Sequence, residues 1–277
     1  MATPIRGVTW ADFLLADVLT SLAKALSDAE RAVCTLASGP AMDPAPGACG
    51  DASWLIPAGL AAPYAWRLVQ CLRVHADTGA RPQLWNALKY ATAFPVIALS
   101  FAKYHVPLPE WRALWKPLWL AAAVANSAFS FYWDVERDWE VGFFSQMGRQ
   151  PGALVPTPVL APALLYPRPF YLYLMASNAL LRLSWIYKLS PHLRRNHFAV
   201  FSLVLAEAFR RFQWMFVRVE VELRKLQAAR PELGQLVPAP AGGAGGGAGG
   251  GAPSPSSSGA TPLKRDASDA SLADAKL

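Results

Sequence analysis

Two adjacent arginines lie inside an apolar helical run. The stretch EAFRRFQWMF, Glu207–Phe216, follows the apolar sequence that begins at about His197 and adds a glutamate and the arginine pair to it. A charge inside a bilayer costs at least about 2.5 kcal/mol, so such residues usually line a cavity and have a function there. Glu207 precedes Arg210 and Arg211 by three and four residues, which lets it pair with one of them on a shared helix face. The spacing therefore predicts that the other arginine faces a polar path.

We expect Arg211 to be the arginine that faces this path. Adjacent helical residues differ in direction by about 100°, so the two side chains cannot both point along one radius. Trp214 lies one turn beyond Arg210, which favours a packed Arg210 and leaves Arg211 for the path.

Single charges also interrupt the other apolar runs. At membrane depth we count five cations and three acids, which are Arg67, Lys89, Arg182, Arg210 and Arg211, and Asp17, Asp134 and Glu207. Several lie in the middle of a run, where their charges cannot reach the headgroups. The charges form either an ion-pair network that locks the helices together or a hydrated path whose excess of cations suits an anion. We favour the path, because the planar guanidinium matches tetrahedral oxyanions such as phosphate.

Two further spacings concern the neighbours of these charges. Arg182 and Trp185 are three residues apart, which places an aromatic ring one turn beyond a cation; anchoring or packing is the plainer role for that ring. Asp134 and Asp138 share a helix face at four residues' separation, but we expect the helix to end at Asp134 and Asp138 to be a boundary residue. The acids would hold an arginine in place or draw it away from an anion, which allows release.

The composition indicates a membrane protein. Of 277 residues, 53% are hydrophobic and only 16% are charged, against about 25% charged in soluble domains. The net charge of +7 is spread among apolar runs, so a nucleic-acid partner is not expected. We find no metal-ligand spacing, no HExxH and no pairing of a nucleophile with a base, so neither a metal, a cofactor nor an enzymatic activity is predicted.

The apolar runs predict an all-α fold, a polytopic transmembrane helical bundle of about six spans. The expected helices are residues 9–37, 54–72, 85–102, 117–133, 170–189 and 197–222. The first is the most polar and is either a pore-facing span, which we favour, or an interfacial helix. Residues 1–8 form an N-terminal segment, 9–230 the membrane domain, and 231–277 a Gly/Ala/Pro/Ser-rich tail that should be disordered. Six spans place both termini on one side, and the first loop, which lacks Lys and Arg, weakly favours the cytosol.

Five ordered motifs, AWRLVQCLR, DTG…LWNALKYAT, FYWDVERDW, NALLRLSW and EAFRRFQWMFVRVEVE, resemble those of the EXS domain. The resemblance runs over residues 65–222. That domain defines the eukaryotic phosphate exporters related to the xenotropic and polytropic retrovirus receptor, the plant root-to-shoot exporters and the yeast Golgi phosphate-recycling proteins. In them, the resemblance implies, phosphate crosses a pore lined by cationic residues of the last six helices.

The charges counted above fall on the motif positions of this family. By resemblance the phosphate-binding residues of the pore are Arg67, Lys89, Tyr90, Arg182, Arg210 and Arg211. Asp17, Asp134 and Glu207 are the charge-pairing acids, and Trp185 is the candidate for gating. Thr20 stands where the exporters tend to have asparagine. The sequence also shows no Lys-rich SPX hairpin before the first helix, which favours the short Golgi-type subclass.

The resemblance implies transport of inorganic phosphate through a cation-lined pore, by an exporter or a Golgi phosphate recycler. The alternative is a Golgi membrane factor that sorts or retains glycosyltransferases. The expected partners are inorganic phosphate, the lipid bilayer and a second copy of the chain. We expect an integral membrane protein of the Golgi or another endomembrane, with the plasma membrane as the second choice.

Overall fold

The computed structural model describes residues 7–37, 53–147, 165–190, 192–193 and 196–229. These residues form helices joined by short turns and contain no strand, so the predicted all-α class is confirmed. The glycine-rich tail and most of the first loop, about which the sequence made predictions, lie outside the described residues.

The described helices fall into six segments that match the six predicted runs, plus one short helix, α8 (Phe143–Met147). The first three segments are α1 (Trp10–Ser21) with α2 (Ala23–Ala37), α3 (Leu55–Thr78), and α4 (Pro82–Ala91) with α5 (Ala93–Ala102). The fourth is α6 (Leu108–Glu110), η1 (Trp111–Trp115), α7 (Lys116–Trp133) and η2 (Asp134–Asp138). The last two are α9 (Arg168–Arg182) with η3 (Ser184–Leu189), and α11 (His197–Ala229).

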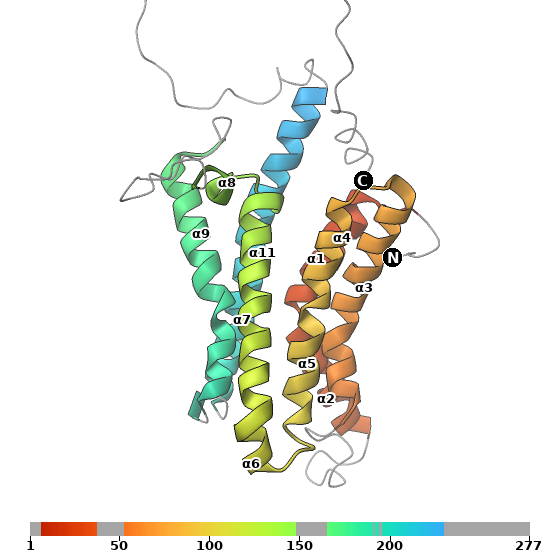
Figure 1. Ribbon diagram of the computed structural model, residues 1–277, viewed down its shortest axis with the longest axis vertical. Helices are drawn as coiled ribbons and strands as arrows, with labels where there is room; N and C mark the ends of the chain where they lie inside the picture. The colour runs from red at the N-terminus through yellow and green to blue at the C-terminus, as the bar shows by residue number, and fades with distance from the viewer. Residues whose placement is uncertain (1–6, 38–52, 148–164, 191, 194–195, 230–277) are drawn as a thin grey trace, which may run out of the picture.

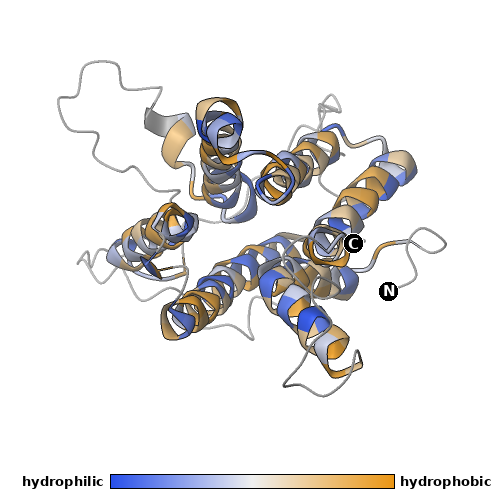
Figure 2. Cartoon of the chain, turned by 90° about the horizontal axis from the view of Figure 1, so that it is seen from below, coloured by the Kyte–Doolittle hydropathy of each residue, from blue (hydrophilic) through white to orange (hydrophobic). Residues whose placement is uncertain are grey.

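The segments stand side by side along one axis, and the C-terminal part of α11 extends past its neighbours at one end (Figure 1). Seen along that axis, the helices surround a common centre and each carries both hydrophobic and hydrophilic residues (Figure 2). The main apolar core lies where η2, α9 and α11 meet, and it includes Val135, Tyr171, Trp214 and Val217, all fully buried. Within the described chain, no helix is at once long enough and apolar enough to cross a bilayer.

Four of the six segments are interrupted near a predicted site residue. The first breaks at Leu22 and the third at Thr92. In the third, Pro95 has no N–H to donate to the carbonyl of Ala91, which accounts for the break. The fifth changes from α-helix to 3₁₀-helix at Leu183, directly after Arg182. Such interruptions leave backbone groups free to line a cavity and are common at functional sites.

The fourth segment does not end at Asp134, as the sequence analysis expected. It continues to Asp138 as the π-helix η2, in which the Trp139 amide donates to the Asp134 carbonyl over 2.9 Å. The wider π-turn keeps Asp134 and Asp138 on the inner side of the bundle, where both are buried. Asp138 is thus the last residue of the helix, as a boundary residue would be, but it is buried, which the sequence analysis did not expect.

Candidate functional site

Every one of the six described segments contributes a charged or polar side chain to one buried group of residues, which we call the central charged cluster. Its charged members are the five cations counted in the sequence, the three predicted acids and Asp138. They come from α1, α3, α4, η2, α9 and α11. Residues separated by as many as 191 positions along the chain, such as Thr20 and Arg211, thus meet at one place.

Asp17 is the acid at the centre of the first half of the cluster. Its carboxylate and Arg67 are each 1% exposed, and Arg67 Nε lies 2.7 Å from Asp17 Oδ1. The Tyr90 hydroxyl donates to the same oxygen over 2.6 Å, and Arg211 Nη1 lies 3.9 Å from Oδ2. The Arg67 guanidinium also stacks between the rings of Phe13, at 4.3 Å, and Tyr90, at 4.8 Å. Packing and charge therefore fix Arg67 firmly.

Asp134 is the acid at the centre of the second half. Its Oδ2 is paired with Arg182 Nη2, accepts from Arg182 Nε over 3.2 Å and from Asn178 Nδ2 over 3.0 Å. Arg210 Nη1 lies 3.6 Å from the same oxygen. One carboxylate oxygen is thus shared by two arginines and an amide from α9 and α11.

The two adjacent arginines of α11 have different partners. Arg210 donates to both oxygens of Glu207, from Nε over 2.9 Å and from Nη2 over 2.5 Å, and it is 4% exposed. Arg211 instead donates to neutral hydroxyls, from Nε to Ser21 over 2.9 Å and from Nη2 to Thr20 over 3.2 Å. Glu207 thus pairs with Arg210, and Arg211 keeps only the long contact with Asp17.

The reason given from sequence for a packed Arg210 is wrong in one respect. The Trp214 ring lies 4.6 Å from the guanidinium carbon of Arg211, not against Arg210. The indole itself is fully buried in the core between η2 and α9. Arg210 is fixed by Glu207 and by Asn178, whose Oδ1 accepts from Nη1 over 3.1 Å.

Lys89 lies in the last turn of α4, where it contacts an acid and two aromatic rings. Its ammonium lies 3.8 Å from Asp138 Oδ2, 4.4 Å from the centre of the Tyr90 ring and 5.5 Å from that of Trp133. Both partners of the ion pair have side chains only 8% exposed. Asp138 is therefore a fourth acid of the cluster and balances a charge that the sequence left without a partner.

Trp185 lies one helical turn beyond Arg182 and is held by two contacts. Its Nε1 donates to Ser127 Oγ over 2.9 Å, and its ring meets Trp119 edge to face with centroids 5.6 Å apart. Ser127 in turn donates to the Arg182 carbonyl over 3.5 Å. The ring is thus coupled to the backbone of the arginine, and its role in gating stays a prediction.

Polar residues that the sequence analysis did not assign to the site hold the two halves together. Ser21 accepts from Arg211 and, over 3.5 Å, from Arg210, and so bridges them. Thr20 donates to the Asp17 carbonyl over 2.7 Å and accepts from Arg211. Its hydroxyl thus acts as both donor and acceptor, as the side-chain amide of an asparagine could at this position. A signal was present in the spacing, since Ser21 is four residues from Asp17 and Asn178 four residues from Arg182.

The cluster has five cations against four acids and therefore keeps one unit of positive charge. An ion pair needs close contact to offset the loss of hydration of both groups. Arg182 and Arg210 meet this condition, whereas Arg211 has two hydroxyl acceptors and an acid at 3.9 Å. Arg67 Nη2 is buried and donates no hydrogen bond to any residue that the structure describes. An incoming oxyanion would find its least compensated donors on these two arginines.

Comparison with known proteins shows which family and which relatives the chain is similar to. The sequence profile of the EXS family matches residues 1–223. The chain is 29% identical over 227 residues to SPX and EXS domain-containing protein 1 of Dictyostelium discoideum, which covers 79% of this chain and 24% of that protein. It is 34% identical over 173 residues to Protein ERD1 homolog 1 of Schizosaccharomyces pombe, covering 59% and 43%. It is 32% identical over 238 residues to the xenotropic and polytropic retrovirus receptor 1 homolog of Xenopus laevis, covering 79% and 33%. The chain spans 24% to 43% of the length of these three relatives.

Proposed function

Because the chain belongs to the EXS family, we propose that it moves inorganic phosphate across a membrane, as an exporter or as a Golgi phosphate recycler. The observation that carries the proposal is the central charged cluster, in which all six segments place charged side chains around one buried point. Cations that are already paired with acids suit a transported anion, which must bind and also leave.

In this proposal the six segments cross a membrane and their outer faces contact lipid. On α11 a stripe of apolar side chains, each between 48% and 77% exposed, supports a lipid contact. Its members are Phe198, Phe201, Leu205, Phe209, Phe212 and Phe216. The 33 residues of α11 extend over roughly 50 Å, more than the roughly 30 Å of a hydrocarbon core. The compartment we propose is the Golgi or another endomembrane, as the resemblance to the Golgi members of the family implies.

The binding step follows from the partners of Arg211. A phosphate oxygen accepts hydrogen bonds more strongly than the hydroxyls of Ser21 and Thr20, so it replaces them on the guanidinium. Asp17 has two roles in this cycle. It remains paired with Arg67 at 2.7 Å throughout, and it attracts Arg211 when the anion leaves. Arg182 and Arg210, paired with Asp134, add positive potential on the other side of the path.

Arg182→Gln tests transport against the alternative role in sorting Golgi enzymes. Loss of this guanidinium removes a cation from the path, and a single charge-assisted hydrogen bond of about 1.5–3 kcal/mol corresponds to a fall in phosphate flux of about tenfold or more. Flux is measured in liposomes, and retention of glycosyltransferases is measured in cells that produce the same variant. Arg168→Gln, an exposed arginine at the start of the same helix, is the matched control.

The expected outcome is that Arg182→Gln loses phosphate flux and Arg168→Gln does not. If retention of glycosyltransferases depends on phosphate transport, it should fail in cells that produce Arg182→Gln and persist in cells that produce Arg168→Gln. If Arg182→Gln transports normally while retaining its fold, the cluster is a structural network and the transport path lies elsewhere. If the unaltered protein retains its client enzymes but carries no phosphate, the sorting role is the correct one.

A further inference from the structure

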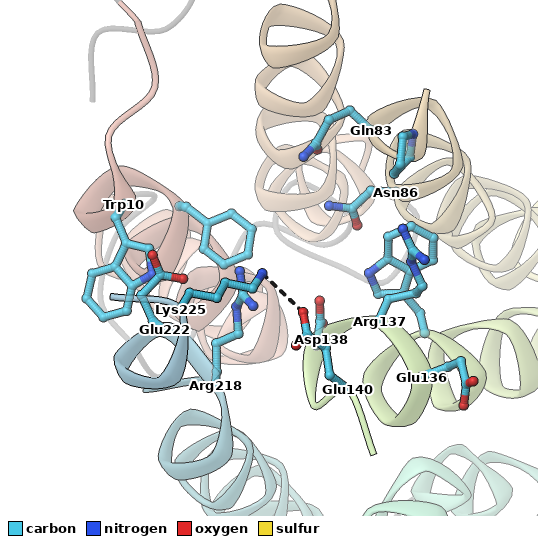
Figure 3. Close-up of a pocket in the computed structure, with 13 residues that line it drawn as sticks. Trp10, Gln83, Asn86, Glu136, Arg137, Asp138, Glu140, Arg218, Glu222 and Lys225 are labelled. Atoms are coloured by element: carbon cyan, nitrogen blue, oxygen red, sulfur yellow. Dashed lines mark ion pairs between the residues drawn. The ribbon is translucent and has the colours of Figure 1, made fainter. Parts of the chain in front are cut away.

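A second polar site lies at one end of the bundle, next to the central charged cluster. A pocket of about 180 Å³ opens there between the start of α1, the start of α4, η2 and the C-terminal half of α11 (Figure 3). A cavity needs only about 10–15 Å³ to hold one water molecule, so a tetrahedral oxyanion with part of its hydration shell fits. Asn86, Trp133 and Asp138 line its inner part, and Lys89 lies directly behind Asp138.

Two of the four carboxylates that line the pocket, Glu136 and Glu140, are held by other groups. Glu136 accepts from the amides of Phe144 and Ser145, each over 3.2 Å, and so turns away from the pocket. Glu140 pairs with Lys225 over 3.1 Å at the rim, the dashed contact in Figure 3. The other two are Glu222 and Asp138, and within the described structure Asp138 forms its ion pair with Lys89 at 3.8 Å.

Five polar atoms of residues that line the pocket are buried and take part in no hydrogen bond within the described structure. Two are acceptors, Asp138 Oδ2 and Asn86 Oδ1, and three are donors, Arg218 Nε, Trp133 Nε1 and Trp10 Nε1. Asp138 is 6% exposed and Asn86 5% exposed. Figure 3 shows Asn86, Asp138 and Arg218 directed into the pocket from α4, η2 and α11. Buried polar atoms without partners are costly, so each points to a water molecule or a ligand.

The mixture of donors and acceptors restricts the chemistry of that ligand. A fully deprotonated oxyanion would place bare oxygens against the Asp138 carboxylate, which repels them. A metal cation would face Arg218 and Lys89. An oxyanion that keeps two protons satisfies both kinds of atom, because its two O–H groups donate to the carboxylate and to the amide oxygen while its other oxygens accept from the guanidinium and the indoles.

We propose that this pocket selects protonated phosphate, with Asp138 and Asn86 accepting hydrogen bonds from P–OH groups and Arg218 and Trp133 donating to the unprotonated oxygens. The inference rests on the proposed transport of phosphate and names the residue that excludes sulfate. Near neutral pH phosphate carries one or two P–OH groups and sulfate carries none, although the two ions have the same shape. A site built to accept from a substrate O–H rejects an analogue that lacks it by a large factor.

The test is competition for radiolabelled phosphate bound to the purified protein near neutral pH. Arsenate keeps an O–H and should compete about as well as phosphate. Sulfate and monofluorophosphate are tetrahedral dianions without an O–H, and they should require at least about tenfold higher concentrations. Equal competition by all three ions would overturn the inference without any variant having to fold.

Asp138→Asn then tests the residue, because an amide can donate to a bare oxygen. The variant should bring sulfate and monofluorophosphate to within about threefold of arsenate, which is the loss of most of the discrimination. Glu140→Gln neutralises a carboxylate of the same pocket that already pairs with Lys225. This control should keep the wild-type ratio between the competing concentrations of sulfate or monofluorophosphate and that of arsenate. An unchanged ratio in a folded Asp138→Asn protein would overturn the assignment to Asp138.

Asn86→Ala removes only the second acceptor and is the variant to use if Asp138→Asn does not fold. It should also lower the concentrations of sulfate and monofluorophosphate needed for competition, relative to that of arsenate. Absence of phosphate binding and of phosphate flux would refute the proposed function itself, whereas binding without this discrimination would refute only the present inference.

Discussion

Replacing Arg210 with glutamine is expected to lower the free energy of unfolding by about 3 kcal/mol. Arg210 holds both oxygens of Glu207, donates to Asn178 and lies 3.6 Å from Asp134. Its removal leaves Glu207 without its close cation in a mostly buried position. The Glu207 side chain is 28% exposed, which lets water reach it and places the effect at the lower end of the roughly 3–5 kcal/mol typical of a broken buried pair.

Thermal unfolding of the purified protein in detergent measures this effect, and Tm should fall by about 6–12 °C. The double variant Arg210→Gln with Glu207→Gln is the informative partner, because it removes the stranded carboxylate as well. It should regain a substantial part of the lost Tm. A single variant as stable as the wild type, or a double variant no better than the single one, would show that the pair does not hold α11 in place.

Arg211→Gln is expected to have the opposite pattern, with little effect on Tm and a fall of about tenfold or more in phosphate flux. Its present hydrogen-bond acceptors are the hydroxyls of Ser21 and Thr20, and Asp17 keeps Arg67 and Tyr90 when Arg211 is lost. No charge is left stranded, so the fold survives. The anion, however, loses the donor with the weakest competing partners.

The two arginine variants are best measured together, in liposomes for flux and in detergent for Tm. Arg211→Lys serves as the conservative variant: it restores the charge but not the two-pronged geometry, so it should transport at an intermediate rate. Equal losses of Tm in Arg210→Gln and Arg211→Gln, with no selective effect on flux, would mean that both arginines are structural. The candidate anion site would then have to be sought outside this motif.

Much of this arrangement can be predicted from the sequence, because two of its patterns are local. Apolar runs long enough for helices predicted all six segments, and a lone charge inside such a run is conspicuous because it is costly there. The pairing of Glu207 with a neighbouring arginine also follows from helical spacing. That this arginine is Arg210 agrees with the structure, although Trp214 was not the reason.

The contacts between helices are what the sequence does not reveal. Spacing along one helix says nothing about which acid of α1 or η2 will face which cation of α3, α4 or α9, since that depends on how the helices pack. The π-helix η2 is the clearest case: an ordinary helix end at Asp134 would have left Asp138 at a boundary, whereas the continued turn brings it to Lys89. The pocket beside Asn86 was missed for the same reason, because it depends on contacts across the bundle.

Phosphate and potassium flux into liposomes that contain the purified protein is the most direct test of phosphate transport through the central charged cluster. With five cations against four acids around the path, phosphate should enter well above the rate of protein-free liposomes, while potassium stays at that background. Equal flux of potassium and phosphate, or phosphate entry no faster than in liposomes without protein, would contradict it.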